Sequence, residues 1–162
     1  ALFNGVSQGM QPLASRVHGK SDREGENKIY KHSLQIAAGI AIVLVLVVLL
    51  FGDSFVLIFN QENSDALAAY AEEGLRIYFL GFLVASFNIV RAGFYSATGR
   101  GKESSILSLS RGIIGIVVFA YLLSRIWGVT GVWLAFPAAE VFTWLLGTVC
   151  MRKRATGEIK EE

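Results

Sequence analysis

Twenty consecutive residues without a charged side chain, Ser33–Gly52, constrain this chain more than any other feature. As a helix rising 1.5 Å per residue, such a run measures about 30 Å, the thickness of the hydrocarbon core of a bilayer. Its stretch 42–48 is rich in Ile and Val, which would favour a strand in water. In lipid, however, an isolated strand leaves its backbone groups unpaired. The run therefore predicts a transmembrane helix.

The composition agrees with a membrane protein. Hydrophobic residues make up 53% of the chain, charged residues only 17%, and the mean hydropathy is +0.50, whereas a soluble domain carries about 25% charged residues. The net charge of +2 is too small to indicate a nucleic-acid partner, and the basic residues lie beside apolar runs. A single cysteine excludes an intramolecular disulfide.

The apolar pattern predicts an all-α fold, a polytopic membrane helical bundle with four full transmembrane helices and one truncated helix. The truncated helix covers residues 1–17, the full spans cover 33–52, 67–96, 104–124 and 132–151, and residues 152–162 form a charged tail. In the span 67–96, Arg76 and Arg91 enclose a short apolar stretch and are expected to reach toward opposite interfaces. Glu72 is expected to pair with Arg76, four residues later.

Basic residues cluster after the first, third and last helices, and the connections between the other helices carry few of them. The clusters are Lys20, Arg23, Lys28 and Lys31; Arg100 and Lys102; and Arg152, Lys153 and Arg154. Since Lys and Arg favour the cytoplasmic side, all three clusters are predicted to face the cytoplasm. We therefore expect a multi-pass protein of the cytoplasmic (plasma) membrane with a cytoplasmic C-terminus.

The first helix carries one continuous polar stripe with the spacing i, i+4, i+7 and i+11. Its members are Asn4, Gln8, Gln11 and Ser15. Two interpretations stay open: the wall of a water-accessible cavity, or hydrogen bonds that hold helices together in lipid. Pro12 in this helix and Pro137 in the last span each remove a backbone hydrogen bond and predict a kink.

Glu140 is the one acid well inside a predicted span, and Arg111 lies at a similar depth on the neighbouring antiparallel helix. A lone carboxylate in hydrocarbon is costly, so we predict an intramembrane Arg111–Glu140 charge pair. The pair could be a proton-linked switch or a structural clamp. The clamp is favoured because an arginine neighbour stabilises the ionised carboxylate.

Motifs of catalysis are missing from the sequence. It contains no phosphate-binding P-loop, no Gly-x-Ser-x-Gly and no His-Glu-x-x-His. His18 and His32 have no further ligand at suitable spacing for a metal site. The sequence predicts neither an enzyme nor a bound cofactor.

Three segments resemble the multidrug and toxic compound extrusion (MATE) transporters. Residues 5–19 look like their eighth helix, with its Gly, Gln, Pro and terminal Gly before a basic loop. Residues 99–111 resemble the start of their eleventh helix, and residues 131–140 their twelfth. The resemblance covers essentially the whole chain but about a third of a complete transporter.

This resemblance implies a C-terminal lobe fragment, helices eight (partial) to twelve, of a twelve-helix transporter with two lobes. The implied activity is secondary active export of cationic amphipathic drugs or organic cations by antiport with protons or sodium. The implied partners are the bilayer and the missing N-terminal lobe helices. The residues expected to line the substrate cavity are Asn4, Gln8, Gln11, Ser15 and Asn88.

Some relatives place a cation-binding acid within the tenth helix. Here that helix has acids only at its outer end, Glu72 and Glu73, with Asn88 deeper. The site of the coupling ion is therefore expected outside this chain. Two alternatives to drug export are a flippase for lipid-linked precursors, which would need more cationic side chains in the cavity, and a non-transporting membrane scaffold.

Overall fold

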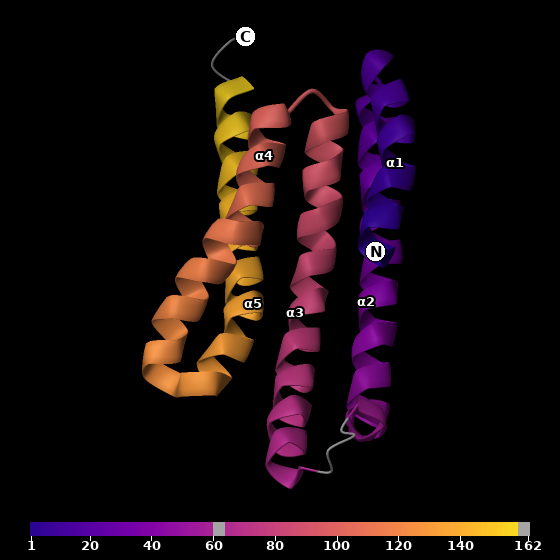
Figure 1. Ribbon diagram of the computed structural model, residues 1–162. Coiled ribbons are helices and arrows are strands. Elements are labelled where there is room, and N and C mark those ends of the chain that lie inside the picture. Colours follow the sequence, from indigo (N-terminus) through magenta and orange to yellow (C-terminus); the bar gives the residue numbers. More distant parts are fainter. Residues whose placement is uncertain (60–63, 159–162) are drawn as a thin grey trace.

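The computed structural model describes the backbone of residues 1–59 and 64–158, and the side chains of these residues other than 59, 65, 66 and 150–158. The described elements are helices in the order α1 (Leu2–Gly19), α2 (Arg23–Phe59), α3 (Asp65–Ala97), α4 (Gly101–Leu109), the π-helical turn η1 (Ser110–Ile114) and α5 (Gly115–Glu158). Figure 1 shows these helices side by side in one bundle. The predicted all-α fold is confirmed.

Helix α3 is the centre of the bundle, since α1, α2, α4 and α5 all pack against it. Helices α1 and α3 run parallel: the Ser7 hydroxyl donates to the Ile89 carbonyl and the Ser15 hydroxyl to the Ala97 carbonyl, a separation of 82 residues in both cases. The buried core is formed by residues of α1, α2, α3 and α4. It comprises Phe3, Met10, Ala14, Ala37, Ala41, Val90, Ala92, Phe94, Tyr95 and Leu107.

The connection between α1 and α2 is shorter than the sequence suggested. Only residues 20–22 join the two helices, and Asp22 Oδ1 accepts a hydrogen bond from the Gly25 amide (2.9 Å), which caps the start of α2. Most of the expected basic loop is thus the first three turns of α2. Residues 33–52 form the middle of this helix, which is much longer than the predicted span.

A glycine ends α3. Gly99 adopts φ +73°, and the Arg100 amide donates to the Tyr95 carbonyl at 2.8 Å. This hydrogen bond, from residue 100 back to residue 95, pairs a carbonyl that the helix end would otherwise leave free. It requires a residue in the left-handed backbone conformation, which glycine adopts most readily.

The chain passes from α4 through η1 into α5 with a non-helical residue, Gly112, inside η1. It reverses direction at Gly128, where φ is +57° and ψ is −129°. Figure 1 shows the resulting hairpin of two adjacent arms. Three helical stretches are long and apolar enough to cross a membrane: Arg23–Ile58, Leu67–Ala97 and Gly101–Val149. The third stretch is folded on itself at Gly128, so the helices of the described residues are roughly consistent with the predicted number of spans.

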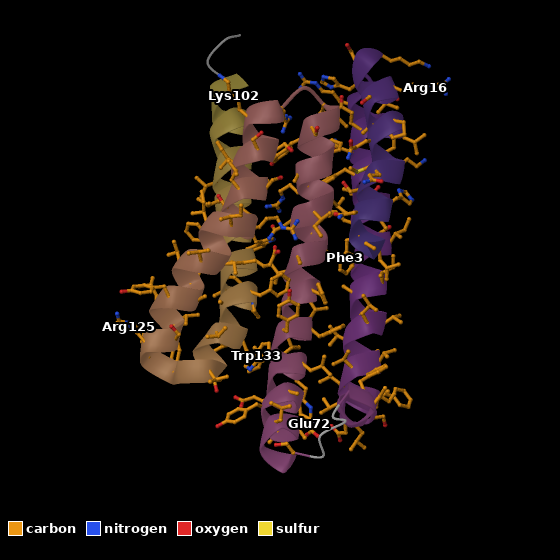
Figure 2. The ribbon with its side chains drawn as sticks, in the orientation of Figure 1. Phe3, Arg16, Glu72, Lys102, Arg125 and Trp133 are labelled. Carbon is orange, nitrogen blue, oxygen red and sulfur yellow. The ribbon has the colours of Figure 1, made fainter. Side chains whose placement is uncertain are left out.

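The ends of the bundle differ in charge. Arg16 and Lys102 lie at one end, and Glu72, Arg125 and Trp133 lie at the other (Figure 2). The backbone of α5 extends to Glu158 at the first end, and residues 159–162 of the expected tail lie outside the described residues. Large apolar side chains between the two ends are exposed, which suits a lipid environment: Leu50, Ile113 and Val117 are 61–78% exposed.

Candidate functional site

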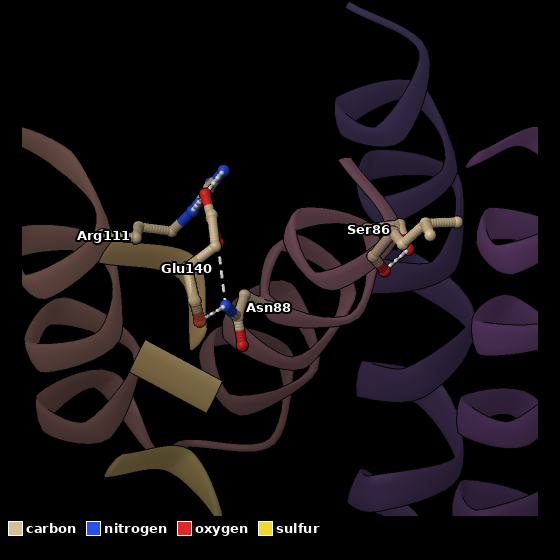
Figure 3. A network of polar contacts seen from close by, with 5 residues as sticks. Ser86, Asn88, Arg111 and Glu140 are labelled. Carbon is tan, nitrogen blue, oxygen red and sulfur yellow. Dashed lines mark hydrogen bonds and ion pairs between the residues drawn. The ribbon is translucent and has the colours of Figure 1, made fainter. Parts of the chain in front are cut away.

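Three helical segments meet in a polar network inside the bundle (Figure 3). Arg111 Nε and Nη2 both donate to Glu140 Oε1, at 3.1 and 2.9 Å. The Asn88 side-chain amide donates to Glu140 Oε2 and to the Glu140 carbonyl, each at 2.8 Å. The structure therefore brings together Arg111 and Glu140, as their depths suggested, and adds Asn88 from α3.

Burial makes these contacts energetically important. Glu140 and Asn88 are fully buried, and the Arg111 side chain is 24% exposed. An isolated carboxylate in an apolar interior would lose most of its solvation free energy. Here both carboxylate oxygens accept hydrogen bonds and the charge has a guanidinium partner. The arrangement ties η1, α5 and α3 together through one salt bridge and two hydrogen bonds from Asn88.

A local distortion positions Arg111. Its helix widens into the π-turn η1, and Gly112 within that turn has φ −84° and ψ −120°. A Cβ at Gly115 would collide with the Ser110 carbonyl and lie 3.0 Å from Ala139 Cβ. Such π-turns are frequent at functional sites because they re-aim side chains. Two glycines thus permit both the distortion and the close approach of the two arms.

Asn88 reaches α5 because the face of α3 on which it lies carries glycines and is therefore flat. Gly74, Gly81 and Asn88 are spaced seven residues apart, so they lie on one face. A Cβ at Gly74 would collide with the Trp133 ring, and a Cβ at Gly81 would lie 2.7 Å from the Phe136 ring. The aromatic rings of α5 therefore lie directly on the backbone of α3.

Arg91 does not behave as the predicted interfacial anchor. It is buried, with 8% of its surface exposed; Nη1 donates to the Trp144 carbonyl (3.2 Å) and Nε to the Tyr30 hydroxyl (3.4 Å). A Cβ at Gly147 would collide with its guanidinium. The prediction was wrong because span length alone does not show that Gly147 leaves room for a buried side chain.

Arg76 also has a different partner from the one predicted. Its Nη2 donates to Asp53 Oδ1 at 2.8 Å, which joins α3 to the outer part of α2. The predicted pairing with Glu72 was therefore wrong. The two side chains that do pair are 48% and 66% exposed, so this ion pair adds little stability.

The polar stripe of α1 lies away from the Asn88 network. The buried face of α1 is Phe3, Ser7, Met10 and Ala14. Asn4 and Gln8 are exposed beside this face, whereas Gln11 is half-buried near Gly93 and Ser15 donates to the Ala97 carbonyl at 3.0 Å. Asn88 faces α5 instead, so the structure does not bring it to the other four expected cavity residues.

The two prolines and a buried threonine complete the description of α1 and α5. Pro12 lies inside α1 and Pro137 inside the second arm of α5, and the non-helical dihedrals of α5 fall at Gly128 rather than at Pro137. Thr143, which the sequence did not single out, is fully buried on α5. Thr143 Oγ1 and Asn88 Oδ1 have no hydrogen-bond partner among the described residues.

The family of this chain is shown by a match between its sequence and a family model. The family model for MatE matches residues 1–122, three quarters of the chain. The chain belongs to the MatE family. It is therefore a multi-pass membrane protein of a transporter family, in agreement with the resemblance found in its sequence.

Curated relatives of this MatE chain include two proteins named multidrug export protein MepA. Those of Staphylococcus haemolyticus and Staphylococcus saprophyticus are 26% and 24% identical to it over 141 and 139 residues. The alignments cover 86% of this chain and 30% of each relative. The chain thus spans about a third of the length of the curated relatives that it matches.

Solved structures share the MatE fold at 20% sequence identity. A multidrug resistance MATE family transporter of the MOP superfamily matches in its outward-facing and inward-facing conformations, with TM-scores of 0.83 and 0.84. Both matches cover 95% of this chain and 35–36% of the other chain. A MOP superfamily transporter from Pyrococcus furiosus, described as having a binding pocket of reversed polarity that suggests a different function, has a TM-score of 0.82 over 93% of this chain and 34% of its own.

Proposed function

We propose that this MatE chain is part of a secondary active transporter that exports cationic amphipathic compounds in exchange for protons or sodium. The observation that carries the proposal is the family match over residues 1–122, together with relatives named for multidrug export. Since the chain spans about a third of those relatives, the activity is assigned to the full-length parent protein, with this chain as helices eight to twelve of its C-terminal lobe.

The α1 stripe supplies the substrate-facing surface in this proposal. Asn4 and Gln8 are exposed beside the buried face of α1, and an amide that faced lipid would be left without hydrogen bonds at a cost of several kcal/mol, on the order of 2–7. These side chains therefore face water or protein in the complete transporter. Neutral amides that line a cavity can bind cationic drugs through hydrogen bonds without holding them too tightly to release.

The network of Asn88, Arg111 and Glu140 acts as a structural clamp in this proposal. Its members hold three segments of the same lobe, and the fold agrees almost equally with outward-facing and inward-facing relatives (TM-scores 0.83 and 0.84). Similar fits to both states support rocking of a rigid lobe, as in other transporters built from repeats. The coupling ion then binds outside this chain, with no cofactor in it.

Charge supports the proposed orientation. The end of the bundle that holds Arg16 and Lys102 faces the cytoplasm, because basic residues are retained on that side. The C-terminal end of α5 lies at the same end of the bundle, so the C-terminus is cytoplasmic as well.

A lipid-linked-precursor flippase is the second candidate, because a neighbour with the same fold, from P. furiosus, is described as having a different suggested function. The discriminating experiment expresses the full-length parent in an efflux-deficient host and follows the release of ethidium, a cationic dye. Energy-dependent release supports drug export. Normal membrane expression without release of ethidium or other organic cations would reject it, and the flippase or a non-transporting scaffold would then be preferred.

A further inference from the structure

Arg91 is a nearly buried cation without an acidic partner among the described residues. None of the ion pairs that these residues form includes it, and only 8% of its surface is exposed. A guanidinium withdrawn from water inside a membrane protein needs a counter-charge, because attraction to that charge offsets the solvation that the cation has lost. The described part of the chain leaves that counter-charge to be supplied by another group.

The Arg91 guanidinium has unused hydrogen-bond donors. Arginine carries five N–H groups, and two of them are used: Nη1 donates to the Trp144 carbonyl (3.2 Å) and Nε to the Tyr30 hydroxyl (3.4 Å). The other three, one on Nη1 and two on Nη2, have no acceptor among the described residues. The buried unpaired atoms of the described side chains do not include Nη2, so Nη2 reaches the surface of the bundle. The Tyr30 hydroxyl accepts from Nε and can donate its own hydrogen to the same ligand.

These donors are held in place by three helices. Within the described residues α2 and α5 both pack against α3 but not against each other, and Arg91 of α3 reaches Tyr30 of α2 and Trp144 of α5. The Tyr30 ring packs on Phe94 of α3, with ring centroids 4.7 Å apart. Gly147 lets the backbone of α5 approach the guanidinium, because a Cβ there would collide with it. The donors are therefore oriented before any ligand binds.

The depth of Arg91 in the bundle brings it close to a membrane surface. Arg91 lies six residues before Ala97, the last residue of α3, a distance of about 9 Å along the helix. Lys102, shortly after α3, lies with Arg16 at this end of the bundle (Figure 2). Trp144 is 40% exposed, and tryptophan is enriched at the level of the lipid headgroups. Since arginine side chains extend toward headgroups, the guanidinium is within reach of lipid phosphates.

We propose that Arg91 and Tyr30 bind the phosphate group of a phospholipid from the membrane leaflet at this end of the bundle. Two phosphate oxygens accept parallel hydrogen bonds from Nη1 and Nη2, and the Tyr30 hydroxyl donates a third. Basic pockets between transmembrane helices bind anionic headgroups in the same way. The phosphate supplies the counter-charge of Arg91, and the lipid links α2 to α5. This site is separate from the export proposed above and does not depend on the exported compound.

The test is native mass spectrometry of the full-length parent in detergent, titrated with phosphatidylglycerol, with a diacylglycerol of the same acyl chains, or with inorganic phosphate. We expect Arg91→Gln to weaken the binding of phosphatidylglycerol by at least about tenfold. Lys102→Gln, which removes an exposed cation at the same end, should bind like the wild type. Diacylglycerol should bind weakly, and inorganic phosphate at the same concentration should not displace the lipid. Equal affinities of the wild type and Arg91→Gln would overturn the proposal, as would displacement by inorganic phosphate or equally tight binding of diacylglycerol.

A second variant keeps the proposal testable if Arg91→Gln fails to fold. Tyr30→Phe retains the aromatic ring and the charge of Arg91 but removes one donor, so phosphatidylglycerol should raise its Tm less than that of the wild type. Tyr70→Phe, at an exposed position near the other end of α3, is the matched control and should respond like the wild type. If an acid elsewhere in the parent were the partner of Arg91, phosphatidylglycerol would raise none of these Tm values, which would overturn the proposal. These readouts measure lipid binding rather than efflux, so failure of this proposal and failure of the export proposal are distinguishable.

Discussion

Asn88 and Glu140 are joined at two points, because the Asn88 amide donates to both the Oε2 atom and the backbone carbonyl of Glu140, each at 2.8 Å. One side chain of α3 thus fixes the side chain and the backbone of α5. Arg111 completes the network from the opposite side of the carboxylate. If the network acts as the proposed clamp between helices, its removal should affect folding before it affects transport.

Removing both members of the charge pair should cost less than the sum of the two single removals. We expect Arg111→Met or Glu140→Gln alone to lower the free energy of unfolding by about 3–5 kcal/mol, because the partner is left buried without its full set of contacts. The double variant Arg111→Met/Glu140→Gln should lose less than the sum of the two single changes. Unfolding in detergent micelles measures all three. Strictly additive losses would contradict a paired clamp, and lost transport at normal stability would give Glu140 a coupling role.

The stability of the bundle should depend on a hydrogen-bond donor at position 88. Asn88→Ala removes two bonds to Glu140 and should cost about 1–3 kcal/mol. Asn88→Asp should cost more, because it places a second acid next to a buried carboxylate and removes the donor. Ser124→Ala is the control and should change stability little, because this half-buried hydroxyl donates only to the Tyr121 carbonyl of its own helix. If the alanine and aspartate variants were equally stable, Asn88 would not be donating to Glu140.

The flat face of α3 predicts a difference between two glycines. Gly81→Ala places a Cβ 2.7 Å from the Phe136 ring and should lower stability by about 1–3 kcal/mol. Gly39→Ala meets no atom within 4 Å and should be neutral or stabilising, by up to about 1 kcal/mol, because alanine favours helix. Thermal unfolding of both variants is the measurement. A destabilised Gly39→Ala with a normal Gly81→Ala would contradict the close packing of α3 against α5.

The hairpin depends on Gly128. Its dihedrals, φ +57° and ψ −129°, are those of the first central residue of a type II′ turn, which strongly favours glycine. Gly128→Ala should therefore destabilise the hairpin by about 1–3 kcal/mol. The control is Gly101→Ala, at an open helical position. Limited proteolysis at the turn should increase in the first variant only; no change would show that the turn tolerates a side chain.

Much of the fold could be predicted from the sequence because membranes restrict the choices. The uncharged run Ser33–Gly52 predicts a transmembrane helix, and the gap between the spans 104–124 and 132–151 predicts the reversal that the structure has at Gly128. The intramembrane depths of Arg111 and Glu140 indicated their contact, since a charge at that depth needs a partner.

The errors have a common physical cause. Pairing of Arg76 with Asp53 and burial of Arg91 against Trp144 both depend on which faces of separate helices meet. Sequence spacing gives the face of one helix but not the neighbour that lies on it. The signal that could have helped was the seven-residue spacing of Gly74, Gly81 and Asn88, which is typical of a close helix contact.

If the clamp holds these helices together as one rigid half of a transporter, distances within the chain should not change during transport. Spin labels can measure those distances in the full-length parent trapped in inward-facing and outward-facing states. One pair, at Leu50 on α2 and Leu145 on α5, is exposed and lies within this chain; a reference pair joins Leu50 to the N-terminal part of the parent. We predict that the first distance stays the same while the reference distance changes. A change of the Leu50–Leu145 distance between the two states would contradict a rigid lobe.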